Sequence, residues 1–231
     1  MTDQISDHFL YQRREYSLAG YSAEVPFHPG ALGMEPEMPD TSCWRGYQLT
    51  YGLAGARLLL IRLLVNLVVD TKDYKRVAGP VIDGVWPVEV YRGNDDFNNH
   101  YINLQYPLEY TGSLFLGSDL IEEFADDIIF PDAWYYRELL ELKFHRGRLT
   151  ETVDFSAKVA DIQVIALQQQ TARQLFFNEL IAAKKSGREE LVEEIKKKRG
   201  ILVSNPPPGE DYDAQISALV SEIFACNEDE K

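Results

Sequence analysis

The amino-acid sequence predicts an α+β fold, with an antiparallel β-rich N-terminal body, one short acidic helix and a C-terminal α-helical extension. Three observations lead to this class. Residues 47–53 alternate apolar and polar side chains with period two, which is typical of a half-buried strand. Apolar residues after Ser156 instead recur every three or four positions, the spacing of one helix face. Frequent Gly, Pro and Asn residues in the first part limit its elements to short segments.

The first strands of the body are predicted from hairpin patterns. Residues 9–21 form two apolar stretches around the polar break 12–14, which favours a β-hairpin. The strand at 47–53 reaches Ala54-Gly55-Ala56, a sequence that can turn the chain. The apolar run 58–69 then returns as a long strand, although its leucine content leaves a helix as the alternative.

The second part of the body combines short strands with a helix. Short β segments are expected within 81–90 and 101–116, and residues 139–155 form a hairpin around His145-Arg146-Gly147-Arg148. Between them, the period changes to that of a helix, because apolar residues from Leu120 to Ile128 share one face and acidic residues the other. This acidic helix is expected to begin at Ser118 or Asp119 and to end at Pro131.

The C-terminal part consists of helices separated by Gly and Pro residues. We expect two domains, a β-rich body at 1–155 and a helical extension at 156–231. The extension is divided by a Gly-containing break and by a Pro-rich break at 204–209. Its predicted helices span 156–184, 188–199 and 212–225, the second of them ended by Gly200.

The charge distribution restricts the classes of partner. The formal net charge is -14, and the 24 acidic and 13 basic residues of the body account for most of it. A negative field repels phosphate, so neither nucleic acid nor an anionic membrane surface is an expected partner, whereas a basic protein is favoured. The most apolar stretch, residues 58–69, is too short to cross a bilayer.

Cysteine content and the N-terminus favour a cytoplasmic protein. The chain has two cysteines, Cys43 and Cys226, which does not suggest a disulfide framework. One disulfide closing a long loop stays open as an alternative. The first residues lack a basic stretch followed by an apolar run, so no secretory signal is expected.

Three segments resemble a family of small bacterial proteins without an assigned biochemistry. They are Cys43-Trp44-Arg45-Gly46-Tyr47, Tyr110-Thr111-Gly112-Ser113-Leu114-Phe115-Leu116-Gly117 and Leu139-Leu140-Glu141-Leu142-Lys143-Phe144. That family has a W-R-G-Y strand before a Y-[ST]-G-x-L strand, and the resemblance spans residues 8–155. It implies a bacterial protein with a β-rich body and adds no catalytic residues.

Trp44, Arg45 and Tyr47 form the first candidate site. An arginine between two aromatic residues suits an anionic or planar ligand, through a charge-assisted fork and stacking. The favoured alternative is structural, with Trp44 and Tyr47 packing the sheet and Arg45 paired with a carboxylate.

The acidic segment 119–132 is a candidate surface for a protein partner. It holds six carboxylates, among them Glu122, Glu123, Asp126 and Asp127. The segment lacks the Asp-x-Asp-x-Asp-Gly pattern of an EF-hand, so a solvated helix face is favoured over a metal site. We expect no metal and no cofactor.

Asp95, Asp96 and His100 form a polar cluster whose side chains suit cation binding or acid-base chemistry. Asn and Asp residues also favour turns, and that structural role is preferred. The sequence shows no nucleophile triad, no H-E-x-x-H helix and no standard phosphate-binding loop. An enzyme is therefore disfavoured without being ruled out.

These observations support two functional hypotheses. The leading one is a non-enzymatic protein-interaction module, for example an immunity or antitoxin-like protein whose carboxylates mask a basic surface. The alternative is an enzyme or small-ligand-binding protein with a pocket near Trp44, Arg45, Asp95, Asp96 and His100. The helical extension also suggests assembly into homo-oligomers.

Overall fold

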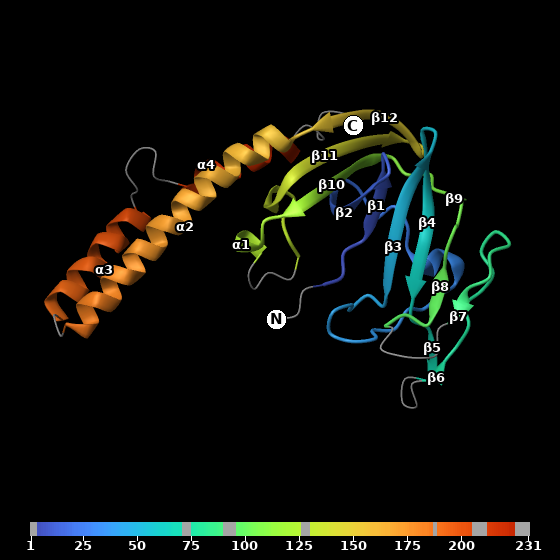
Figure 1. The fold of residues 1–231 in the computed structure, drawn as a ribbon, viewed down its shortest axis with the longest axis horizontal. Helices are drawn as coiled ribbons and strands as arrows, with labels where there is room; N and C mark the ends of the chain where they lie inside the picture. Colours follow the sequence, from blue (N-terminus) through green and yellow to red (C-terminus); the bar gives the residue numbers. More distant parts are fainter. Residues whose placement is uncertain are drawn as a thin grey trace. The chain divides into compact units, whose positions relative to one another are not determined.

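Strands are the main regular elements of the first two thirds of the chain and helices those of the last third, which confirms the predicted α+β class. The computed structural model describes residues 4–70, 75–89, 96–125, 130–186, 189–204 and 212–224. Two compact units result, Met1–Ser156 and Ala157–Lys231, and each is described separately below. Figure 1 shows the strands of the first unit and the helices of the second.

The longest connection between two strands is that from β2 to β3, which contains a 3-10 turn. The strands are β1 (His8–Tyr11), β2 (Arg14–Tyr21), β3 (Tyr47–Ala54), β4 (Arg57–Val65), β5 (Val68–Asp70), β6 (Lys75–Arg76), β7 (Val88–Glu89), β8 (Asn99–Tyr101), β9 (Tyr106–Pro107), β10 (Gly112–Leu120), β11 (Tyr136–His145) and β12 (Arg148–Asp154). The helices are α1 (Glu122–Ala125), α2 (Ser156–Lys185), α3 (Glu189–Ser204) and α4 (Tyr212–Phe224), with 3-10 turns η1 (Pro29–Leu32) and η2 (Ala133–Tyr135).

The large sheet closes on itself. Its strand order is β12-β11-β10-β2-β1-β3-β4-β8-β7, with β9 also paired to β4 (Figure 1). The pair β1–β3 is parallel, and the other described pairs are antiparallel. An additional pairing of Arg148 with Arg57 brings β12 against β4 and completes a ring of seven strands. The amide of Leu58 donates to the carbonyl of Gly147 at 2.8 Å and strengthens this closure.

The interior of the ring is the main hydrophobic core. It is formed by alternate residues of the strands, as the period-two pattern predicts, and includes the fully buried Tyr51, Leu60 and Leu114. Burying one such leucine or aromatic side chain stabilises the fold by about 1.5–3 kcal/mol. The period-two pattern of residues 47–53 therefore identified the inward face of β3, which carries Tyr47, Leu49 and Tyr51.

The predicted hairpins are confirmed, and their turns use left-handed backbone. β1 and β2 pair antiparallel around Gln12 and Arg13, whose φ angles are 49° and 66°. β11 and β12 turn at Arg146 and Gly147, with φ angles of 47° and 71°. Positive φ at both central residues matches the twist of the flanking strands.

The predicted acidic helix is corrected at its start. Ser118 and Asp119 do not cap a helix, because β10 continues to Leu120, which pairs with Tyr136 of β11. The described helix α1 covers only Glu122–Ala125. Cross-strand hydrogen bonds to β11 outweighed the local helical period of this segment, and such pairing cannot be read from the segment itself.

The helices of the second unit follow the predicted ranges with one correction. Gly200 does not end the second helix, since α3 continues to Ser204. A glycine inside a helix costs only about 1 kcal/mol relative to alanine, which neighbouring interactions can offset. Val192 and Ile195 of α3 pack with Phe176 and Leu180 of α2, so these two helices form a hairpin. In the described parts of the chain, no helix has the length and apolar character needed to cross a membrane.

Candidate functional site

Arg45 forms an ion pair with Asp7, in which the carboxylate is buried and the guanidinium remains partly exposed. Its Nη1 and Nη2 donate to the two carboxylate oxygens at 2.8 and 2.6 Å, and its Nε donates to the carbonyl of Tyr47 at 2.9 Å. The amide of Leu49 donates to the same carboxylate at 2.7 Å. The pair joins the segment before β1 to the segment before β3. The geometry is therefore that of the structural alternative weighed for Arg45.

The protonation behaviour of the pair reflects its burial. Burial raises the pKa of Asp7, because the charged carboxylate loses water, and Arg45 opposes this shift by attraction. Burial also works against the charge of Arg45, but attraction and hydrogen bonds from Asp7 outweigh it and raise the pKa of the guanidinium. The arginine stays cationic and holds its partner in place.

The aromatic neighbours of Arg45 differ in burial, so the expectation that both pack the sheet is met by Tyr47 and not by Trp44. Tyr47 is buried, stacks edge-on against His28 with ring centroids 5.4 Å apart, and carries the Arg45 guanidinium 5.0 Å above its ring. Trp44 is 52% exposed, and its amide donates to Gln4 Oε1 at 2.9 Å. A ligand at Trp44 would thus meet an arginine already committed to Asp7.

The described residues of the predicted polar cluster, Asp96 and His100, lie just before β8 and within it. His100 lies in β8, where its Nε2 donates to the carbonyl of Phe97 at 3.0 Å. Asp96 lies near Asp40, in the loop before Trp44, while Asp95 lies outside the described residues. The structure thus brings Asp96 to the loop that leads to the W-R-G-Y segment.

Two asparagines beside this cluster have a structural role that sequence reasoning missed. Asn98 is buried, accepts from the amide of Leu67 at 2.8 Å and donates to its carbonyl at 3.1 Å. Asn99, also buried, donates to the carbonyl of Val77 at 2.8 Å and accepts from Gly79 at 2.7 Å. These amides satisfy backbone groups that would otherwise be unpaired, which is one reason for two adjacent asparagines.

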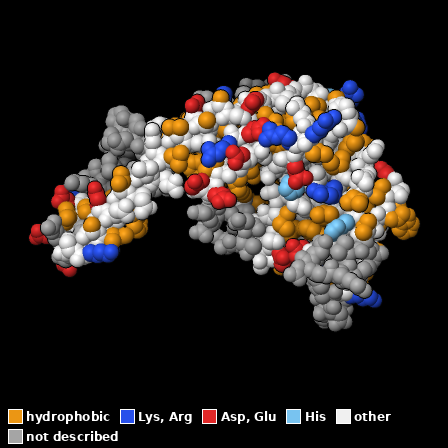
Figure 2. All heavy atoms as spheres, viewed as in Figure 1, with side chains coloured by type: hydrophobic (Ala, Val, Ile, Leu, Met, Phe, Trp, Pro, Cys, Tyr) orange, Lys and Arg blue, Asp and Glu red, His pale blue; other side chains and the backbone are white. Residues whose placement is uncertain are grey.

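The acidic segment lies between β10 and β11 and is held at its base. Glu122 and Glu123 are exposed in α1, whereas Asp126 and Asp127 lie outside the described residues. Phe124 packs on Trp134 and Tyr135 at centroid distances of 5.3 and 5.9 Å. Figure 2 shows acidic side chains gathered over α1.

The same segment carries an exposed aromatic side chain. Phe130 is 67% exposed and follows Glu123 by seven residues in the sequence. The amide of Ile121 donates to the carbonyl of Tyr135 at 2.9 Å, which ties the two ends of the segment together. Among the residues that the structure describes, no cluster of three His, Cys, Asp or Glu side chains is arranged to hold a metal ion.

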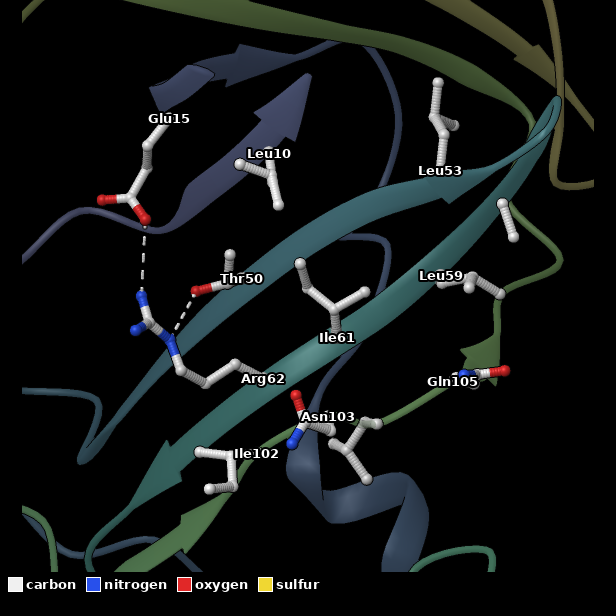
Figure 3. Close-up of a pocket in the computed structure, with 12 residues that line it drawn as sticks. Leu10, Glu15, Thr50, Leu53, Leu59, Ile61, Arg62, Ile102, Asn103 and Gln105 are labelled. Carbon is white, nitrogen blue, oxygen red and sulfur yellow. Dashed lines mark hydrogen bonds and ion pairs between the residues drawn. The ribbon is translucent and has the colours of Figure 1, made fainter. Parts of the chain in front are cut away.

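A groove of about 550 Å³ lies over β1, β3 and β4, and we call it the β4 groove (Figure 3). Its apolar wall is formed by side chains of three strands and of the connection between β8 and β9: Leu10, Leu53, Leu59, Ile61, Ile102 and Leu104. Its polar groups are Glu15, Thr50, Arg62, Asn103 and Gln105. None of the residues chosen from the sequence lines it.

Arg62 is the cation of the β4 groove. Its Nε donates to Thr50 Oγ1 at 3.0 Å, and its Nη2 lies 3.6 Å from Glu15 Oε2 (Figure 3). The side chains of Arg62 and Glu15 are 38% and 53% exposed. This ion pair is longer and more exposed to solvent than that of Arg45. An anionic ligand that replaced Glu15 as the partner of Arg62 would therefore lose little binding free energy by breaking the pair. The signal in the sequence was a single arginine inside the apolar run 58–69.

No protein-family model, curated protein or solved structure matches the chain. The resemblance to a bacterial family therefore stays a prediction.

Proposed function

We propose that the protein is a non-enzymatic interaction module whose acidic segment binds a basic protein partner. The observation that carries this proposal is the exposure of Glu122 and Glu123 together with Phe130, on a segment whose base is clamped by Phe124, Trp134 and Tyr135. Aromatic residues are enriched at the centres of protein interfaces, and charged residues at their rims. The clamped base reduces the ordering cost on binding.

Electrostatics favours a basic partner. The body of residues 1–155 carries 24 acidic and 13 basic side chains, so its mean field attracts positive surfaces. Complementary charge mainly speeds association and excludes wrong partners, while Phe130 supplies apolar area. An immunity or antitoxin-like protein that covers a basic active surface is the form of this function that fits the charge pattern best.

The test is capture of a partner with tagged full-length protein and with charge variants. The binding variant carries Glu122→Gln, Glu123→Gln, Asp126→Asn and Asp127→Asn. The matched control carries Glu24→Gln, Glu35→Gln, Asp83→Asn and Glu109→Gln, four exposed carboxylates elsewhere on the body. We expect a stoichiometric complex that weakens with salt, survives in the control and is lost in the binding variant. A complex that forms equally with both variants would refute the role of the segment.

A second candidate function, binding of a small anionic ligand, is favoured by the β4 groove. Its volume suits a small molecule, and Arg62 beside Leu10 and Ile61 suits a carboxylate on an aliphatic body. The pocket predicted near Arg45 would require breaking the Asp7 ion pair first, so the β4 groove is the better site. Isothermal titration with decanoate, with decanol as the uncharged control, tests this candidate. Binding that is equal for both compounds, or unchanged in Arg62→Gln, would exclude it.

A further inference from the structure

Helix α2 presents a row of side chains to solvent along most of its length. We call Val164, Leu167, Thr171, Leu175, Asn178 and Ala182 the α2 row. Their spacing of three or four residues places them on one face of the helix. All six are exposed, and the three large apolar ones, Val164, Leu167 and Leu175, are 55%, 47% and 60% exposed.

This row is separate from the face that α2 uses within its own unit. The hairpin contact with α3 is made by Phe176 and Leu180, which pack with Val192 and Ile195. At 3.6 residues per turn, these positions lie about half a turn around the helix from the α2 row. Thus α2 has apolar side chains on two sides, and only one side is occupied by α3.

The surroundings of the row are almost free of charge. Residues 162–178 contain one charged residue, Arg173, whereas 26% of the whole chain is charged. Five glutamines, one asparagine and one threonine provide the polar groups of that stretch. A surface that bound a basic partner would be expected to carry carboxylates, and this surface carries none between Ile162 and Asn178.

Amide side chains suit contact with an identical surface. In a two-fold symmetric dimer the same patch lies on both sides of the interface, so a patch with a net charge repels its own copy. Amides both donate and accept hydrogen bonds, and an amide surface is therefore complementary to itself. In a chain with a net charge of -14, a neutral apolar face is the place where two copies can approach with least repulsion.

We infer that the α2 row is a self-association surface that pairs with the α2 row of a second copy of this chain. The row extends over about 27 Å, since 18 residues each rise 1.5 Å. Leu167 and Leu175 supply the apolar contact, and Thr171 and Asn178 lie between and beside them as polar positions. Polar residues within an apolar helix–helix interface are known to set the alignment of the paired helices and the number of helices that associate.

The experiment measures the molar mass of the full-length protein by sedimentation equilibrium over a range of concentrations. Wild type is expected to approach twice its chain mass of 26.4 kDa. Leu175→Glu is expected to weaken dimerisation by about 100-fold, because both copies lose a leucine contact and place a carboxylate in the interface. Leu167→Glu is expected to act in the same direction.

Phe177→Glu is the matched control. Phe177 is 54% exposed on the same helix, but it lies away from the α2 row, so its variant should dimerise like wild type. Far-ultraviolet circular dichroism establishes that each variant keeps its helices. A wild type that stays monomeric at every concentration, a folded Leu175→Glu or Leu167→Glu variant that dimerises as tightly as wild type, or an equal loss in Phe177→Glu would overturn the inference.

Discussion

Removing Arg45 is expected to destabilise the body strongly. The substitution Arg45→Ala leaves the carboxylate of Asp7, which is only 8% exposed, with the amide of Leu49 and without its cation. Breaking a buried ion pair from one side typically costs about 3–5 kcal/mol. Because the Arg45 side chain is itself 35% exposed, we expect the lower end, about 3 kcal/mol.

The reverse substitution should cost less. Asp7→Ala leaves Arg45 unpaired, but a guanidinium that is 35% exposed can turn towards water. We expect a cost of about 2 kcal/mol, and a double variant whose cost is well below the sum of the two. This order of effects follows from the unequal burial of the two partners.

The pH dependence of Arg45→Ala has a definite sign. Burial holds the pKa of Asp7 above its ordinary value of 3.8 in the folded protein. A raised carboxyl pKa means that the cost of burying the charge is absent below 3.8 and grows as the pH rises through the folded pKa. The stability deficit of Arg45→Ala should therefore shrink in acid.

Urea unfolding followed by tryptophan fluorescence is the appropriate assay. The three tryptophans, Trp44, Trp86 and Trp134, all belong to the unit Met1–Ser156, so the signal reports the body. The matched control is Arg137→Ala, whose partner Asp119 is 3.3 Å away in an exposed pair and should contribute less than about 1 kcal/mol. An Arg45→Ala cost no larger than that of Arg137→Ala would refute the structural role of the ion pair.

Three further predictions concern the sheet and the start of α2. Gly147→Ala should destabilise the body by about 2 kcal/mol or more, because φ there is +71° and the added Cβ would overlap the carbonyl oxygen of Leu108. Thermal unfolding measures this cost. Gly55→Ala is the control, since Gly55 also has a positive φ but an added Cβ there meets no atom within 4 Å. Ser113→Ala should lower the free energy of unfolding by about 1–3 kcal/mol, measured in urea. Ser113 Oγ donates to the buried Glu141, whose other carboxylate oxygen has no hydrogen-bond partner among the described residues. An unchanged free energy of unfolding would contradict this prediction. Asp154 accepts a hydrogen bond from the Ser156 amide at 2.9 Å, and hydrogen bonds from Ser156 lower the pKa of Asp154 below 3.8. The contribution of Asp154 to stability is therefore present above pH 3.8 and is lost as the pH falls through the folded pKa. Asp154→Asn should lack this acid-dependent loss, which acid titration by circular dichroism detects, and an unchanged titration would count against it.

The sites show where sequence reasoning reached its limit. Glu122 and Glu123 were expected to be exposed from the helical period, and they are exposed. The groove cation Arg62 was visible only as an interruption of an apolar run. Its partners Thr50 and Glu15 come from other strands, and no local pattern indicates which strand lies next to which.

Local periodicity by itself determined much of this protein. Period two at 47–53 and the turn chemistry at Arg146 and Gly147 were sufficient for strands and hairpins, and the three-to-four spacing after Ser156 was sufficient for α2. These features depend on neighbours in the chain, because burying one face of a strand or helix requires apolar residues at its own repeat.

Only the tertiary structure decided which elements meet. The parallel pairing of β1 with β3, the closure of β12 on β4 and the ion pair of Asp7 with Arg45 join segments far apart in sequence. The end of β10 at Leu120, where a helix was predicted, was decided in the same way by β11. Such contacts depend on the packing of the whole body, whose free energy no single segment encodes, and the β4 groove is formed by that packing.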